Sequence, residues 1–104
     1  MRIALSLALV LLAAPASATG ADPATGAHIA KTECATCHAV DPAAEAKSPD
    51  PKAPRFVDVA RMPSTTELSL KVFLRSSHKN MPNFILSSEE IDSLASYILE
   101  LGGK

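Results

Sequence analysis

The two cysteines of this 104-residue chain lie three positions apart, and a histidine directly follows the second: Cys34-Ala35-Thr36-Cys37-His38. This C-x-x-C-H pattern is typical of covalent haem attachment. In such a site each thiol forms a thioether with a haem vinyl group, and the adjacent neutral imidazole binds the iron from the proximal side. We therefore predict Cys34 and Cys37 as the attachment residues and His38 as the first axial ligand.

Two other kinds of site use paired cysteines. A redox-active dithiol or disulfide is expected within a βαβ segment, and nothing around these residues has that pattern. A structural zinc site requires four ligands, and no second Cys or His pair follows at zinc-finger spacing. Both remain alternatives, but haem attachment accounts for the five residues more completely.

The first eighteen residues have the features of a secretory signal peptide. Arg2 gives a basic start, the run from Ile3 to Ala14 is apolar apart from Ser6, and Ala16-Ser17-Ala18 forms a small-residue cleavage site. The run is too short to span a bilayer, which takes about 20 residues. A retained amphipathic or membrane helix is the alternative. We predict cleavage after Ala18, export to the periplasm, and no membrane span in the mature chain.

Residues 19–104 then form one small domain. With no Trp, one Tyr and three Phe in the chain, side chains alone supply little core volume. A buried haem would fill that volume, so we expect the haem-free chain to fold poorly. Loss of Arg2 would change the formal net charge from −1 to −2, and this balance gives no sign of nucleic-acid binding.

The first half of the domain predicts one helix followed by a long loop. Asp22-Pro23 is a cap and first-turn signal for a helix that continues through Ile29 and Ala30 into the cysteine motif. The segment from Val40 to Pro54 is rich in proline and lacks an apolar period, so it is a predicted loop. Residues 56–60 form either one helical turn or a short extended piece.

The second half predicts two helices. Ser64 and Glu67 form a capping box ahead of a helix with Leu68, Val72 and Phe73 at helical spacing, and Pro82 ends any continuation after Met81. Ser87 and Glu90 form a second capping box. The final helix has a regular apolar stripe and stops at Gly102-Gly103; the stripe residues are Ile91, Leu94, Ala95, Ile98 and Leu101. The predicted fold class is all-α.

These motifs, in this order, resemble the small class I c-type cytochromes. The matching pieces are Gly26 before the cysteine motif, Pro54, the helix Leu68 to Arg75, Met81-Pro82, and the helix Ile91 to Leu101. The resemblance covers nearly all of residues 19–104. It implies a monohaem cytochrome c domain, with three main helices and long loops around one covalently bound haem c.

The resemblance also implies two contacts. The Pro54 carbonyl would accept a hydrogen bond from the His38 imidazole, although a rigid turn is an equally good role for this proline. Gly26 would lie where the first and last helices cross, with Tyr97 beside it. The chain departs from the family in having Ala30 where an aromatic residue is usual, and Ala53 where the loop usually has glycine.

The second axial ligand has four candidates after signal cleavage: Met62, Met81, His28 and His78. Met81 is favoured because Pro82 frees the segment from helix, and because a loop and a helix separate it from His38, enough chain to reach the opposite haem face. Met62 is better explained as core filler. A histidine ligand and an open position are the remaining alternatives.

Two axial protein ligands leave no open position for a substrate, so we expect no enzymatic activity and predict one-electron transfer. The proposed carrier would exchange electrons with redox partners such as a periplasmic dehydrogenase and a terminal oxidase or reductase. A dedicated haem c subunit, or docked electron acceptor, of a periplasmic dehydrogenase is the alternative. A peroxidase or gas sensor is disfavoured by Met81.

Other residues are expected to frame this site. Leu70, Phe73 and Leu74 would form part of the apolar wall next to Met81. Arg55 and Arg61 are candidates for pairing with the haem propionates, with a solvated arginine as the alternative. Two lysines near the expected haem edge, Lys71 and Lys79, indicate a locally basic contact surface, although solvated side chains explain them equally well.

Overall fold

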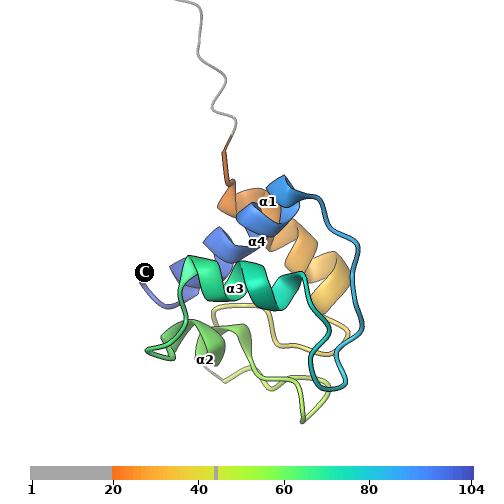
Figure 1. The fold of residues 1–104 in the computed structure, drawn as a ribbon. Helices are drawn as coiled ribbons and strands as arrows, with labels where there is room; N and C mark the ends of the chain where they lie inside the picture. The colour runs from red at the N-terminus through yellow and green to blue at the C-terminus, as the bar shows by residue number, and fades with distance from the viewer. Residues whose placement is uncertain (1–19, 44) are drawn as a thin grey trace, which may run out of the picture.

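The computed structural model describes residues 20–43 and 45–104 (Figure 1). In chain order its elements are α1 (Pro23–Ile29), the π-helical turn η1 (Ala30–Cys34), α2 (Phe56–Arg61), α3 (Glu67–Leu74) and α4 (Ser88–Leu101). These residues contain no β-strand, only one isolated bridge between His78 and Met81. The all-α prediction is therefore confirmed. The predicted signal peptide lies outside the described residues.

Helix α4 is the element around which the others are arranged. It packs against α1, α2 and α3, and Figure 1 shows α2 at the end of the molecule away from α1. The core between these helices includes Ile29, Phe56, Leu70, Leu94 and Ile98, all nearly inaccessible to solvent. None of the helices in the described ranges is long and apolar enough to cross a membrane.

Helix α1 begins as its sequence predicts. Asp22 is the N-cap, and its carboxylate accepts hydrogen bonds from the backbone N–H groups of Ala24 at 3.1 Å and Thr25 at 3.2 Å. Pro23 occupies the first turn, where its missing N–H is not needed. The hydrogen bond from the Thr25 hydroxyl, and to a smaller extent these backbone bonds, lower the pKa of the Asp22 carboxyl below its ordinary value.

The crossing of α1 and α4 is centred on Gly26. A Cβ atom at this position would lie 2.1 Å from the Ser93 carbonyl oxygen and 2.9 Å from the Tyr97 Cβ. The two backbones can approach this closely only because glycine has no side chain. The Ser93 hydroxyl also accepts a hydrogen bond from the Asp22 N–H at 3.0 Å. The predicted helix crossing is therefore confirmed.

Helix α4 has both predicted end signals. The Ser87 hydroxyl accepts a bond from the Glu90 N–H at 3.1 Å, and the Glu90 carboxylate accepts one from the Ser87 N–H at 2.7 Å. Gly102 is the C-cap, and Gly103 has a left-handed φ of 71°. The predicted stripe is buried at Ile91, Leu94, Ala95 and Ile98 and half-buried at Leu101.

The predicted N-cap of α3 is wrong. Thr66, not Ser64, caps this helix, in a capping box with Ser69. Ser64 lies in a turn closed by the Thr65 N–H on the Met62 carbonyl at 3.0 Å. The ammonium group of Lys104 donates to the carbonyls of Met62 and Thr65, at 2.8 and 2.9 Å. These bonds from the C-terminal residue stabilise the turn at residues 62–65, so that α3 begins after Thr66.

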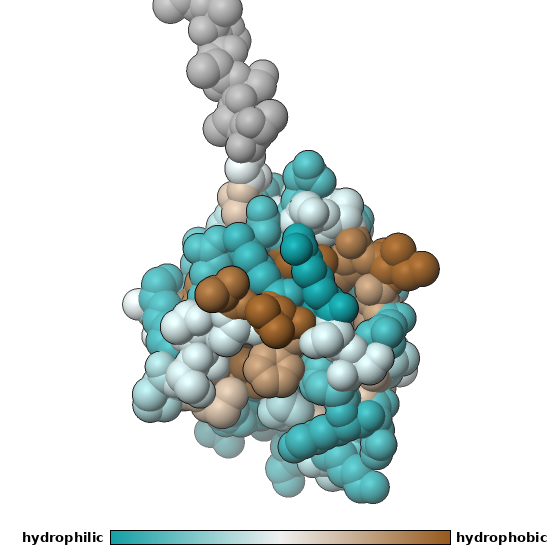
Figure 2. Space-filling model, viewed as in Figure 1, coloured by the Kyte–Doolittle hydropathy of each residue, from teal (hydrophilic) through white to brown (hydrophobic). Residues whose placement is uncertain are grey.

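The apolar residues expected to form the buried face of α3 are not the ones that the structure buries. Leu70 is buried and Leu74 packs against the core, whereas Leu68 and Val72 are 71% and 57% exposed. Apolar side chains accordingly gather on the outer face of α3 in the view of Figure 2. Residues 56–60, left open between helix and extended structure, belong to α2.

Candidate haem site

The cysteine motif follows α1 through η1, which ends at Cys34. The carbonyl of Cys34 accepts hydrogen bonds from the N–H groups of Cys37 at 3.1 Å and His38 at 2.9 Å. The chain therefore makes a tight helical turn that brings the three side chains to one region, since residues three and four apart are neighbours on such a turn. Cys34 is buried, and Cys37 and His38 are half-buried.

The imidazole of His38 is held from two sides. Its Nδ1 lies 2.6 Å from the carbonyl oxygen of Pro54, and because a carbonyl can only accept, Nδ1 carries the proton. The ring also packs against Phe56, with 5.2 Å between ring centroids and 49° between planes. Nε2 is thereby left as the basic nitrogen, which is the atom an axial histidine offers to iron. The contact implied for Pro54 is confirmed.

The loop that supplies Pro54 is tied to the cysteine motif by its backbone. The Asp50 N–H donates to the Cys37 carbonyl at 3.1 Å, and the Phe56 N–H donates to the Ala39 carbonyl at 2.9 Å. The hydroxyl of Ser48 accepts a bond from the Ala39 N–H at 3.0 Å. These bonds fix the distance between His38 and the carbonyl that orients it.

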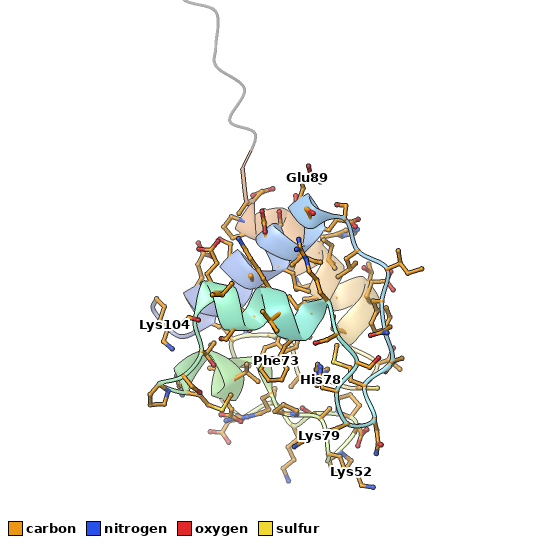
Figure 3. The ribbon with its side chains drawn as sticks, in the orientation of Figure 1. Lys52, Phe73, His78, Lys79, Glu89 and Lys104 are labelled. Atoms are coloured by element: carbon orange, nitrogen blue, oxygen red, sulfur yellow. The ribbon has the colours of Figure 1, made fainter. Side chains whose placement is uncertain are left out.

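Met81 lies in the segment between α3 and α4. Its N–H donates to the His78 carbonyl at 3.1 Å, and Lys79 within this turn has a left-handed φ of 49°. The ring of His78 meets that of Phe73 edge to face, with centroids 5.1 Å apart. Figure 3 shows these two side chains close together, beneath α3. The turn that carries Met81 is thus anchored to α3.

Cys34 and Met81 line the same pocket, although they are distant in sequence. Its wall is mostly apolar, and the lining includes the side chains of Phe73, Leu74, Phe84, Leu86 and Leu94. Phe73 and Leu74 therefore lie where the sequence predicts an apolar wall, whereas Leu70 belongs to the core. His38 is not among the residues lining this pocket.

The other candidate ligands lie elsewhere. Met62 follows α2 and is not among the residues that line the Cys34–Met81 pocket. It is 48% exposed, so the expectation that it fills the core is wrong. His28 lies on α1 and lines an adjacent groove together with Thr32 and Ile85; this groove shares wall residues with the Cys34–Met81 pocket. His78 contacts Phe73. Met81 lines the pocket that Cys34 lines, and the other three candidates are not among the residues that line it.

Burial gives Cys34 the properties of an unreactive thiol. Removal from water, and to a smaller extent the negative charge of Glu33, raise the pKa of this thiol to about 11. Redox-active dithiols instead have lowered pKa values, because the thiolate is the nucleophile. In addition, the part of the chain that the structure describes contains no group of three or more His, Cys, Asp or Glu side chains placed to hold a metal ion. The raised pKa of the Cys34 thiol disfavours a redox-active dithiol.

Two of the charged residues expected around the site, Arg55 and Lys71, have carboxylate partners within the protein. The Arg55 guanidinium bonds the Asp58 carboxylate through Nε and Nη2, each at 2.7 Å. Lys71 pairs with both Glu67 and Asp92, so two neighbouring carboxylates balance its charge. Lys79 is exposed, and Figure 3 shows it at the end of the molecule that also carries Lys52.

Two polar residues of the site were not predicted from the sequence. Ser48 binds the backbone beside His38, and nothing in a long loop signals which hydroxyl will do so. Thr32 donates back to the carbonyls of His28 and Ile29. A threonine four residues after a helical carbonyl is a known back-bonding arrangement, so the sequence did contain a signal for Thr32.

An all-α domain that holds a C-x-x-C-H turn, an oriented histidine and a methionine pocket has the architecture of a class I c-type cytochrome. Residues 21–98 match the family described as "Cytochrome C oxidase, cbb3-type, subunit III". The chain is also 39% identical over 92 residues to cytochrome c-552 of Bradyrhizobium diazoefficiens, an alignment covering 88% of this chain and 86% of that protein. No solved structure matches it.

The chain therefore belongs to this cytochrome c family and is a small class I c-type cytochrome. Membership implies covalently bound haem c, haem-based electron transfer, and partner proteins that exchange electrons with it. The donor set fits that group, because two cysteines three positions apart are followed directly by a histidine whose Nδ1 is bonded to Pro54, which leaves Nε2 for iron.

Proposed function

We propose that this chain is a periplasmic one-electron carrier with a single haem c. Cys34 and Cys37 would hold it through thioether bonds, and His38 and Met81 would bind the iron from opposite faces. The observation that carries the proposal is the pocket shared by Cys34 and Met81, together with the fixed orientation of the neighbouring His38 ring. Export would follow cleavage of the signal after Ala18.

The ligand pair accounts for electron transfer rather than catalysis. Haem held in this way supplies an iron that alternates between Fe(II) and Fe(III). With the His38 nitrogen and the Met81 sulfur both bound, no position remains for oxygen or a substrate. The soft methionine sulfur stabilises Fe(II), and the apolar wall of Phe73, Leu74 and Leu94 disfavours the additional charge of Fe(III). Both effects raise the reduction potential.

The mass of the purified protein under denaturing conditions tests attachment, haem number and signal cleavage together. We expect the mass of residues 19–104 plus one haem. Cys37→Ala should lose most of the covalent haem and most of the soluble protein, whereas Thr36→Ala, at the exposed position beside it, should retain both. A wild-type mass without haem would refute the attachment, and retention of residues 1–18 would refute the predicted cleavage.

A second function is favoured by one observation. Leu68 and Val72 on the outer face of α3 are large, apolar and exposed, as is common where a protein docks on a partner. The chain would then be a dedicated haem c subunit, or docked acceptor, of a periplasmic dehydrogenase. Gel filtration after gentle lysis separates the two functions: a carrier elutes at the size of the isolated domain, and a subunit elutes with a large partner.

A further inference from the structure

The turn that delivers Cys34 is not an ordinary helical turn. Residues Ala30–Cys34 form a π-helix between α1 and the cysteine motif. Such turns are rare, appear mostly as single turns within α-helices, and occur frequently at functional sites. We therefore looked for a side-chain contact that stabilises the π-helical hydrogen-bond register over the α-helical one.

The hydroxyl of Thr32 is placed to do this. In an α-helix the His28 carbonyl would bond the backbone N–H of Thr32, four residues later, whereas in a π-helix the partner is one residue further on. Here the Thr32 hydroxyl donates to the His28 carbonyl at 3.1 Å and to the Ile29 carbonyl at 3.2 Å. It thus binds the two carbonyls at the start of the wide turn.

The π-turn lies directly before the cysteine motif and ends at Cys34. A change of one residue in helical register rotates a side chain by about 100° around the axis. Upstream, the register is fixed by the contact of Gly26 with Ser93. With the wide turn in place, Ile29, Ala30 and Cys34 are all buried, at 7%, 0% and 6% exposure, and Cys34 lines the pocket of Met81.

We propose that Thr32 is a positioning residue: its hydroxyl holds the π-turn, and the π-turn directs Cys34 into the attachment pocket. This inference rests on the proposed function, because it assumes that Cys34 forms a thioether. In that reaction the Cys34 S–H adds across a vinyl C=C bond, with sulfur bonding one carbon and hydrogen the other. No oxidant or reductant is consumed.

The test is the fraction of haem-bearing chains in which Cys34 remains a free thiol. The holoprotein is denatured, free thiols are alkylated, and peptides are measured by mass spectrometry. Thr32→Val removes the hydroxyl at nearly constant shape and should raise the Cys34-free fraction several-fold, with Cys37 still linked. Thr32→Ser keeps the hydroxyl and should match the wild type. A general loss of stability would lower the yield without selecting one cysteine.

Thr25→Val is the matched control. Thr25 is also an exposed threonine at this end of the molecule, but its hydroxyl bonds the Asp22 carboxylate at 2.6 Å and does not touch the π-turn. We expect wild-type linkage at Cys34 in this variant. An increase of the free Cys34 fraction equal to that of Thr32→Val would overturn the role of the π-turn.

Three further results would overturn the inference. The first is a wild-type Cys34-free fraction in Thr32→Val. The second is a Thr32→Ser protein that behaves like Thr32→Val, since the hydroxyl would then be irrelevant. The third needs no variant: an experimental structure of the wild-type holoprotein with residues 30–34 in α-helix. A wild type linked only through Cys37 would instead refute the proposed two-thioether site, and this inference with it.

Discussion

At the scale of single residues, the surroundings of His38 restrict its imidazole to one role. The Pro54 carbonyl accepts a hydrogen bond from the Nδ1–H group at 2.6 Å, and packing against Phe56 limits rotation of the ring. A ring held in this way presents Nε2 in a fixed direction, which lowers the entropy lost when a ligand bond forms. The same bond ties the cysteine motif to the loop that ends at Pro54.

Tyr97 makes a comparable contact from α4. Its hydroxyl donates to the Val40 carbonyl at 2.5 Å, joining the last helix to the chain just after His38. Burial, and secondarily the charge of Asp41, raise the pKa of Tyr97 above its ordinary value of 10.0. The folded state therefore favours the neutral phenol, which is the form that donates.

This pKa shift predicts a pH-dependent effect of Tyr97→Phe on the holoprotein. Because the folded-state pKa is raised, the contribution of the phenol is fully present below pH 10 and is lost as the pH rises through the folded-state pKa. At pH 7 we expect the variant to be less stable by roughly 0.5–1.5 kcal/mol. Denaturant unfolding at pH 7 and at pH 11 should show that the difference shrinks. An equal difference at both pH values would contradict this.

Sequence reasoning was most reliable for site residues defined by local spacing. Cys34, Cys37 and His38 form a continuous motif, so their proximity required no knowledge of the fold. The contact of Pro54 with His38 depended on resemblance to a family, because the length of the intervening loop does not determine it. Ser48 could not be found at all, since its hydroxyl is selected by the path of that loop.

At the scale of elements, the crossing of α1 and α4 positions both sides of the site. Helix α1 leads through η1 to Cys34, and α4 contributes Leu94 to the pocket that Cys34 shares with Met81. The closest approach is at Gly26, where the neighbouring atoms are backbone and Cβ atoms of α4 that cannot rotate away. A change in this crossing should therefore be transmitted to the pocket.

Gly26→Ala tests the crossing directly. The added methyl group would lie 2.1 Å from the Ser93 carbonyl oxygen and 2.6 Å from its carbon, so the helices must separate. Overpacking of this kind typically costs 1–3 kcal/mol, and thermal or denaturant unfolding measures it. Gly20→Ala is the control, because nothing lies within 4 Å of a Cβ there. A Gly26→Ala protein as stable as the Gly20→Ala protein would disprove the tight crossing.

Element prediction succeeded where local signals and tertiary contacts agree. Ser87 and Glu90 cap α4 as expected, each side chain accepting a bond from the other residue's backbone N–H. The box of Ser64 and Glu67 has a comparable pattern, yet it does not form. Lys104 holds the Met62 and Thr65 carbonyls, and the Thr65 hydroxyl donates to the Val59 carbonyl at 2.5 Å. These contacts place Ser64 in a turn, which a local pattern cannot reveal.

At the scale of the whole molecule, the hydrophobic core is built from few large side chains. Leu94 is the largest side chain among the described residues that is fully buried, and the chain contains no Trp. Under the proposed function, haem linked at Cys34 and Cys37 would contribute apolar contacts as well as redox chemistry. This dependence explains why loss of one cysteine is expected to reduce soluble protein as well as haem content.

The central claim is that His38 and Met81 close both faces of the iron, because this makes the protein an electron carrier. The weak near-infrared band of sulfur-to-ferric-iron charge transfer tests it most directly. We predict that the oxidised wild type and Met62→Ala show this band. Met81→Ala should lose the band and have a lower reduction potential, with haem still covalently bound. A band that persists in Met81→Ala, or is lost in Met62→Ala instead, would contradict the assignment.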